Sequence, residues 1–313
     1  MRAALVLILG PTASGKSALA LAAAEHFGGT VINADSMQVY RDLEVITARP
    51  DATMLARAPH CLYGFLDAAD PCSAERWADL AAGAVRSSLD AGRVPILTGG
   101  TGLYVRALLE GFSPMPDVPA EIRADLMADL RALGPQALHG RLAEVDGTAA
   151  ARIPPGDSQR IVRALEVWRA SGHPISWWQA QPSRPPRLDL PALTVVLAPP
   201  RAELYRRCDQ RFLAMLESGA LEEVERLAAR QLDPDLPAMK ALGVPELMAH
   251  LQGLLDLDAA ARAACTATRR YAKRQSTWFR NQIVADLILD TQSSERMMAE
   301  IFPKMSEFLL TGR

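Results

Sequence analysis

Cysteine is scarce in this sequence, and so is an excess of charge of either sign. The four cysteines are scattered and no two of them form a C-x-x-C pair, so neither a zinc site nor a disulfide framework is indicated. The formal net charge of −2 gives no general attraction for nucleic acid, so any such partner has to meet a local basic face. No apolar run approaches the roughly 18 residues that a membrane span requires. Together these absences favour a cytoplasmic protein that does not associate with membranes.

The size and composition of the chain favour one large folded core. With 313 residues, of which 49% are hydrophobic and 22% charged, the chain has an ordinary globular composition. Such a length also leaves room for a smaller appended or inserted unit. Residues 1–9 combine an arginine with a short apolar run, as a signal peptide does, but the run leads directly into a glycine-rich motif that cleavage would destroy. We therefore expect this segment to be retained.

The glycine-rich motif at 10–17 fits the phosphate-binding pattern G-x-x-x-x-G-K-[ST]. An apolar run of strand length precedes it, and an Ala- and Leu-rich helical segment that ends at Gly28 follows it. In this order, backbone N–H groups of the loop and the helix N-terminus converge on phosphate oxygens. We expect Lys16 to pair with the phosphates and the Ser17 hydroxyl to ligate Mg²⁺. The motif consists of Gly10, Pro11, Thr12, Ala13, Ser14, Gly15, Lys16 and Ser17.

An acidic residue follows the second predicted strand, at 30–34. Asp35 then stands beside the phosphate loop, at the edge where open α/β sheets bind their ligands. Alternatively, Asp35 or Ser36 caps a following turn, with Gln38 in capping-box register. The spacing alone leaves both interpretations open.

The third predicted strand, at 94–98, ends in a threonine and glycines. A nucleotide hydrolase often has an acid here that organises Mg²⁺ and the attacking water, so Thr98 counts against an ATPase. Gly99 and Gly100 suggest a second backbone approach to phosphate, with the Thr101 hydroxyl as a candidate donor. The alternative is a plain strand-to-helix turn. A helix is predicted just before this strand, with Ser73 as its N-cap and Gly92 as its stop.

Residues 117–180 read as helices without a strand, over 119–133, 135–145 and 157–170. A proline-rich connector follows, and 193–197 is again an apolar strand. This order predicts an α/β fold with a parallel sheet flanked by helices and an inserted all-helical domain. We assign residues 1–112 and 190–313 to the core and 113–189 to the insertion.

Two later helices are strongly basic. One spans 201–216, and a longer one opens at Asp258 and runs through Arg280. Between Arg262 and Arg280 every charged side chain is basic, and like charges stand at i,i+4, which destabilises a helix unless a polyanion neutralises them. Tyr271, Trp278 and Phe279 among them either stack on bases or pack inward. This pattern favours nucleic-acid contact over a solvated face. A last strand is predicted at 283–289, and the tail beyond it carries little information.

Four motifs taken together are similar to those of the bacterial tRNA dimethylallyltransferases (isopentenyltransferases). They are GPTASGKS at 10–17, DSMQVY at 35–40, GGTGLY at 99–104 and ATRRYAKRQSTWFR at 267–280. The resemblance covers nearly the whole chain and implies a P-loop NTPase-like core. It also implies transfer of a dimethylallyl group from its diphosphate to N6 of the adenine just 3′ of the tRNA anticodon. The partners implied are the tRNA anticodon stem-loop and dimethylallyl diphosphate, with Mg²⁺ as cofactor, and we expect a monomer.

The resemblance also implies roles for individual residues. The loop at 10–17 would hold the diphosphate, Asp35 would accept the N6 proton, Thr101 would lie near the reaction centre and Arg211 would meet the leaving diphosphate. The implied tRNA contacts are Asp35, Ser36, Met37, Gln38, Thr101, Arg123, Gln159, Arg160, Ile161, Val162, Arg163, Lys240, Ala241, Leu242, Gly243, Val244, Pro245, Lys273, Arg274, Gln275 and Arg280.

Two points leave the assignment open in detail. The family commonly has Gly-Tyr where this chain has Gly243-Val244-Pro245, which puts the contacts of that loop in doubt. The alternative function is a small-molecule P-loop kinase, whose small acceptor would leave the basic helix at 262–280 without a ligand.

Overall fold

The computed structural model describes residues 3–290 and 294–311. The chain forms two compact units, each with its own core. The first comprises Met1–Leu109 and Arg187–Arg313, and the second comprises Glu110–Pro186.

The first unit is built on a six-stranded sheet in the order β3-β2-β4-β1-β5-β6, with every pairing parallel. The fold class predicted from the sequence is therefore confirmed. Both faces are covered by helices, which explains why the central strands are continuous apolar runs. The strands are β1 (Leu5–Leu9), β2 (Gly29–Asn33), β3 (His60–Cys61), β4 (Val94–Gly99), β5 (Ala192–Leu197) and β6 (Leu287–Leu289).

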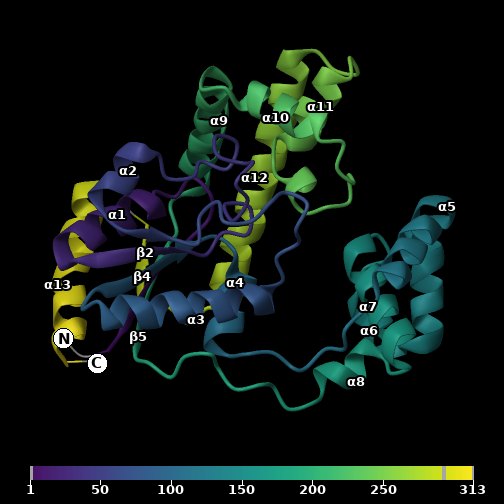
Figure 1. The fold of residues 1–313 in the computed structure, drawn as a ribbon, viewed down its shortest axis with the longest axis horizontal. Coiled ribbons are helices and arrows are strands. Elements are labelled where there is room, and N and C mark those ends of the chain that lie inside the picture. Colours follow the sequence, from purple (N-terminus) through teal and green to yellow (C-terminus); the bar gives the residue numbers. More distant parts are fainter. Residues whose placement is uncertain (1–2, 291–293, 312–313) are drawn as a thin grey trace. The chain divides into compact units, whose positions relative to one another are not determined.

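Helices α1 (Lys16–Phe27) and α13 (Ser294–Thr311) pack together on one face, and α3 (Ala74–Asp90) and α4 (Gly102–Leu109) lie on the other (Figure 1). Ser73 caps α3 as predicted, its hydroxyl accepting a hydrogen bond from the Arg76 N–H. Helix α13 was not foreseen from the sequence. Its buried Met297, Ile301 and Met305 follow helical spacing and join the core of this face.

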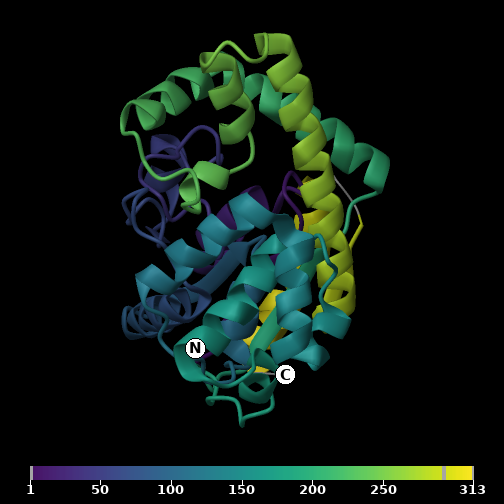
Figure 2. The same cartoon turned by 90° about the vertical axis from the view of Figure 1, so that its right-hand side faces the viewer.

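The same unit carries a helical group beyond the sheet, in which α12 (Leu257–Gln282) packs against α9 (Arg201–Glu217) and α11 (Val244–Leu251). In Figure 2, α12 is the long yellow-green helix. The predicted strand at 283–289 is shorter than expected, and it begins only at Leu287 after α12 has continued to Gln282. The members are α9 (Arg201–Glu217), α10 (Ala220–Ala229), the 3₁₀ helix η1 (Ala238–Lys240), α11 (Val244–Leu251) and α12 (Leu257–Gln282); the short α2 (Ala52–Arg57) follows β2.

The second unit is entirely helical, with α5 (Ala120–Val145), α6 (Gly147–Arg152), α7 (Ser158–Ser171) and α8 (Ile175–Gln179). Gly134 interrupts α5 with φ 79° and ψ 167°, and Pro135 starts the next helical segment. The two separate helices predicted at 119–133 and 135–145 are therefore confirmed. Buried Asp146 holds the unit together, because its carboxylate caps α6 and also accepts bonds from Ser176 at the start of α8.

Candidate active site

Three loops leave the sheet at its carboxyl edge, after β1, β2 and β4, whose ends lie in register. The latter two loops are hydrogen-bonded to each other: the Ala34 N–H donates to Thr98 O (2.7 Å) and the Thr101 N–H donates to Ala34 O (3.1 Å). Only glycine fits at position 99, because a Cβ there would lie 2.1 Å from Ala34 O. The Thr98 hydroxyl is buried and donates to Ile8 O, so this side chain serves the sheet.

The loop after β1 lines a cavity with residues 12–17. Gly10 and Gly15 have φ of 156° and 94°, which glycine adopts readily, and Ala13 has φ 62°. Ser14 Oγ is the one buried side-chain oxygen or nitrogen without a hydrogen-bond partner among residues 3–290 and 294–311. Since buried hydroxyls are normally paired, this group is available to donate to an anion bound in the loop.

Lys16 supplies the positive charge of this loop. Its Nζ is buried and donates to Pro11 O at 3.1 Å. Burial lowers the pKa of Lys16 to about 8, an effect that nearby Asp35 partly offsets and Arg211 reinforces. The Lys16 charge thus lacks full compensation by the protein and favours binding of an anion.

Asp35 is held by its own loop. Its Oδ1 accepts the Met37 N–H at 2.9 Å, and its backbone is bracketed by buried Asn33. The Ser36 N–H donates to Thr101 Oγ1 at 2.9 Å, so Thr101 ties this loop to α4. Gln38 is also engaged within the protein, because its Nε2 donates to Thr47 O and Ala48 O.

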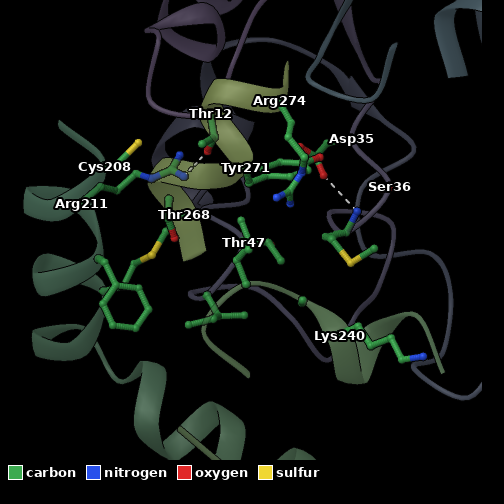
Figure 3. Close-up of a pocket in the computed structure, with 16 residues that line it drawn as sticks. Thr12, Asp35, Ser36, Thr47, Cys208, Arg211, Lys240, Thr268, Tyr271 and Arg274 are labelled. Atoms are coloured by element: carbon green, nitrogen blue, oxygen red, sulfur yellow. Dashed lines mark hydrogen bonds between the residues drawn. The ribbon is translucent and has the colours of Figure 1, made fainter. Parts of the chain in front are cut away.

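Arg211 reaches the phosphate loop from α9 and donates a hydrogen bond to Thr12 Oγ1 (Figure 3). Burial lowers the pKa of Arg211 below its ordinary value, but a guanidinium stays charged in proteins. Lys16 is near enough to feel the charges of Asp35 and Arg211, and Arg211 is near enough to feel that of Asp35. This cluster combines two cations with one carboxylate beside the orphaned hydroxyl of Ser14.

Two cavities meet at this cluster. One, of about 420 Å³, runs along the phosphate loop and includes Lys16 and Ser17. The other, of about 260 Å³, lies among α9, α12 and the segment 35–47 (Figure 3). Part of the lining of the second cavity is apolar, formed by Ile46, Phe212, Met215 and Leu242. The residues that line both cavities are Thr12, Asp35, Thr47 and Arg211.

Helix α12 contributes an aromatic and a basic side chain to the second cavity. The guanidinium carbon of Arg274 lies 5.5 Å from the centre of the Tyr271 ring. Burial, with the charge of Asp35, raises the pKa of Tyr271, so its hydroxyl stays protonated. The other two aromatic residues of this helix differ: Phe279 is buried, and Trp278 packs where Gly102 leaves room for its ring.

The basic surface is smaller than the sequence suggested. Arg269 forms an ion pair with Asp209 of α9 at 2.6 Å, so its charge is partly compensated within the protein. On α9, Arg206 and Arg207 both pair with Glu203. The exposed basic residues of α12 include Arg270, Lys273, Arg274 and Arg280.

Several residues predicted to contact tRNA are buried, so their side chains are not presented on the outer surface; their contact with tRNA stays a prediction. Ile161 and Val162 lie in the core of the second unit, since α7 turns its apolar face inward. Gln275 is 5% exposed and bonds within the protein. Ala241 and Val244 are also buried, although Ala241 lines the second cavity.

The remaining predicted residues of the second unit lie on its surface. Gln159 and Arg160 are exposed at the start of α7. Arg123 and Arg163 both pair with the buried carboxylate of Glu166, at 2.9 Å and 3.3 Å. These guanidinium groups are thereby fixed in place while staying about half exposed.

The 240–245 loop has a defined geometry despite its unusual sequence. Lys240 and Leu242 line the second cavity. Gly243 has φ 92°, and a Cβ there would lie 2.7 Å from the Phe212 ring, so glycine is required. Val244 then begins α11 and Pro245 occupies an early helical position, where its missing N–H costs nothing.

The sequence interpretation missed the segment 41–50, which forms a wall shared by the cavities. Buried Glu223 of α10 fixes it, because its carboxylate accepts the N–H groups of Glu44, Val45 and Ile46. No periodic pattern marks this segment, and Glu223 lies 179 residues from Glu44 in the chain. Only the fold brings them together.

Comparison with known proteins identifies the family of this chain. The family model described as IPP transferase matches residues 38–282, and a second, described as isopentenyl transferase, matches residues 3–61. The chain belongs to the IPP transferase family. The resemblance inferred from the four motifs is therefore confirmed.

Members of this family are similar to the chain over nearly its whole length. The tRNA dimethylallyltransferase of Rhodospirillum centenum is 58% identical over 280 residues, covering 90% of this chain and 89% of that protein. The tRNA dimethylallyltransferase of Rhodospirillum rubrum is 52% identical over 314 residues, covering 99% and 96%.

Solved structures from the family are also similar. The tRNA isopentenylpyrophosphate transferase of Bacillus halodurans has a TM-score of 0.70 at 32% identity, covering 98% of this chain and 96% of that one. A eukaryotic dimethylallyltransferase acting on tRNA has a TM-score of 0.77 at 27% identity, covering 99% and 80%.

Enzymes of this class typically use a metal ion with a diphosphate substrate. In the described part of the chain, no cluster of three His, Cys, Asp or Glu side chains forms a metal site. No helix among the described residues is long and apolar enough to cross a bilayer.

Proposed function

We propose that this protein transfers a dimethylallyl group from dimethylallyl diphosphate to N6 of the adenine 3′-adjacent to the anticodon in tRNA, releasing diphosphate. The observation that carries the proposal is the meeting of a cationic phosphate-loop cavity and a partly apolar cavity at Asp35, Thr12, Thr47 and Arg211. A donor with a charged head and a short apolar tail, attacked by a nucleobase, needs this combination of surfaces.

Asp35 acts as the general base. The exocyclic amine of adenine is conjugated to the ring and is a weak nucleophile, so removal of its proton during attack assists the reaction. The N6–C1 bond forms as the C1–O bond to the diphosphate breaks, and the N6 proton passes to the Asp35 carboxylate. The Met37 N–H holds one carboxylate oxygen in place, and Thr101 supports the same loop through Ser36.

Lys16 and Arg211 stabilise the leaving diphosphate. Negative charge builds on the bridging oxygen as the C–O bond breaks, and buried Lys16 and partly buried Arg211 counter it without reorganising at the moment of reaction. The Ser14 hydroxyl, which has no hydrogen-bond partner among the described residues, donates to a phosphate oxygen. The backbone N–H groups and the N-terminus of α1 hold the same anion.

Mg²⁺ fits the residues present. The Ser17 hydroxyl is exposed at the start of α1 and lines the same cavity as Asp35, so it supplies an oxygen ligand that phosphate oxygens would complete. When bound, the ion neutralises part of the diphosphate charge.

We infer RNA contacts for the exposed basic side chains of α12 and for Lys240. Within the second unit, we infer RNA contacts for Arg123, Gln159, Arg160 and Arg163. The target adenine has to leave its stack to enter the cavity, where the Tyr271 ring offers a stacking surface. We expect a monomer to be sufficient, because every group in this reaction scheme comes from one chain.

The test is incubation of the protein with unmodified tRNA and labelled dimethylallyl diphosphate, with ATP as a competing donor. Label in the RNA at the adenine 3′ of the anticodon is the expected result. Phosphate transfer from ATP without prenylation of RNA would instead support a small-molecule kinase.

A further inference from the structure

Gln275 joins the long helix α12 to two loops of the candidate active site. Its Oε1 accepts the Thr12 N–H of the phosphate loop at 2.8 Å, and its Nε2 donates to Gly100 O at 2.8 Å. The side chain is 5% exposed, and its partners are 263 and 175 residues away in the sequence. One side chain thus holds the loop after β1 and the loop after β4 in a fixed relation.

The surroundings are shaped for this bridge. A Cβ at Gly100 would lie 2.2 Å from Gln275 Nε2, so the glycine leaves the space that the amide occupies. One turn earlier on the same face of α12, Ala272 packs in a cluster with Leu204, Cys208 and Ala13 of the phosphate loop. The neighbouring Lys273 is exposed instead. Helix α12 therefore presents one face to the phosphate loop and another to solvent.

The bond to Thr12 has a chemical consequence. Its N–H is committed to Gln275 and its hydroxyl accepts from Arg211, so Thr12 is held from α12 and from α9. Ala13 next to it adopts φ 62°, a conformation that costs a non-glycine residue energy unless neighbours enforce it. The groups left to meet an anion are those that follow, including Ser14 and Lys16.

We propose that Gln275 is a positioning residue for the diphosphate-binding loop. It sets the shape of the loop through Thr12 and anchors it to the loop that carries Thr101, without touching either substrate. This rests on the proposed function only in naming diphosphate as the ligand. Replacing the amide leaves the Thr12 N–H and the Gly100 carbonyl unpaired, so the phosphate loop relaxes and the anion site loses its shape.

The test compares Gln275→Met, which keeps the side-chain length and removes both hydrogen bonds, with Lys273→Met on the solvent face. Binding of inorganic diphosphate with Mg²⁺ is measured by calorimetry on the full-length protein, alone and with saturating anticodon stem-loop RNA. RNA binding is measured separately. For Gln275→Met we expect the Kd for diphosphate to rise about tenfold, the scale of one to two hydrogen bonds, and the Kd for RNA to change less than about twofold. For Lys273→Met we expect the Kd for RNA to rise and the Kd for diphosphate to change little.

Gly100→Ala leaves α12 unchanged, and the added Cβ displaces the Gln275 amide from Gly100 O. If both substitutions act through one bridge, the double variant binds diphosphate about as weakly as either single variant. Wild-type diphosphate affinity in both single variants, or an effect confined to RNA binding, would overturn the proposal. Should Gln275→Met fail to fold, Gly100→Ala decides alone. Because this readout needs no prenyl transfer, a wrong proposed function and a wrong role for Gln275 give different results.

Discussion

The side-chain amide of Asn33 forms hydrogen bonds with both the N–H and the carbonyl of the Asp35 backbone. Oδ1 accepts the Asp35 N–H at 2.9 Å, and Nδ2 donates to Asp35 O at 3.0 Å and to Leu62 O at 3.0 Å. Asn33 is fully buried at the end of β2, and its own carbonyl accepts the Trp77 indole N–H. The proposed base is therefore positioned by a residue of the sheet and not only by its loop.

Asn33→Asp should impair catalysis while donor binding persists. A carboxylate retains the acceptor for the Asp35 N–H but faces two carbonyl oxygens with no proton to donate, so the Asp35 loop shifts. We expect the single-turnover rate to fall by about 10- to 100-fold, the scale of misplacing a catalytic group. Diphosphate affinity should stay within about threefold, because the phosphate loop is untouched. A large drop in diphosphate affinity with an unaltered rate would contradict this.

Asp35→Asn should abolish most of the chemical step. An amide cannot accept the N6 proton, and general-base assistance is worth about 10²- to 10⁴-fold. RNA affinity should change little, since the substitution removes no cation. Rapid-quench transfer with saturating RNA and donor measures the step directly, and a rate within about threefold of wild type would exclude Asp35 as the base.

The pH dependence of kcat/KM for the donor should show the titration of Lys16. Its pKa in the free protein is lowered to about 8, so raising the pH through this value removes the charge that attracts the diphosphate. We expect kcat/KM for the donor to fall above about pH 8, as one proton is released. In Lys16→Arg the cation persists, so this alkaline limb should disappear whatever the absolute rate. An unchanged limb in that variant would assign it to another group.

Lys16→Met should make the protein more stable and inactive. A folded-state pKa of about 8 against an ordinary 10.5 means that burying the charged lysine costs stability at neutral pH. Between pH 8 and 10.5 the unfolded chain holds the proton that the folded chain has released, so wild-type stability rises with pH. The advantage of Lys16→Met should therefore be largest below about pH 8 and shrink above it. Thermal unfolding at about pH 7 and about pH 10 tests this sign.

Reversing the charge of Arg270 and Arg274 should weaken RNA binding and flatten its salt dependence. Both side chains are exposed on α12, and each phosphate that a variant no longer neutralises lowers the slope of log K against log salt by about one. Lys304→Glu on α13, also exposed, is the control for net charge. Equal salt slopes in the wild type and the double variant would show that this face is merely solvated.

Local pattern was enough to predict the strand–loop–helix order around 10–17, the helix capped by Ser73 and the break of α5 at Gly134. Each depends on residues a few positions apart, where propensity, caps and glycine conformations act. Helix α13 was not predicted, because its residues carry no motif and Pro303 stands within its helical pattern.

The charges of α9 and α12 show what local sequence pattern does not predict. Both helices read as strongly basic, yet Arg269 pairs with Asp209 and Arg206 with Glu203. The second of these pairs lies within one helix, at i,i+3, and was within reach of the sequence; the first joins two helices. An ion pair between helices depends on packing that no single segment determines.

The sequence by itself determined the family, the parallel α/β core and the phosphate loop, because these rest on contiguous motifs with their own local geometry. Only the tertiary structure decided which of the predicted residues face a cavity and which are buried. Gln275 is the clearest case. It follows Arg274 directly in the same motif, but the two side chains lie on different sides of α12, so Gln275 is buried and Arg274 is exposed. The cavity wall held by Glu223 likewise exists only after distant segments pack, since its partners are far apart in the chain.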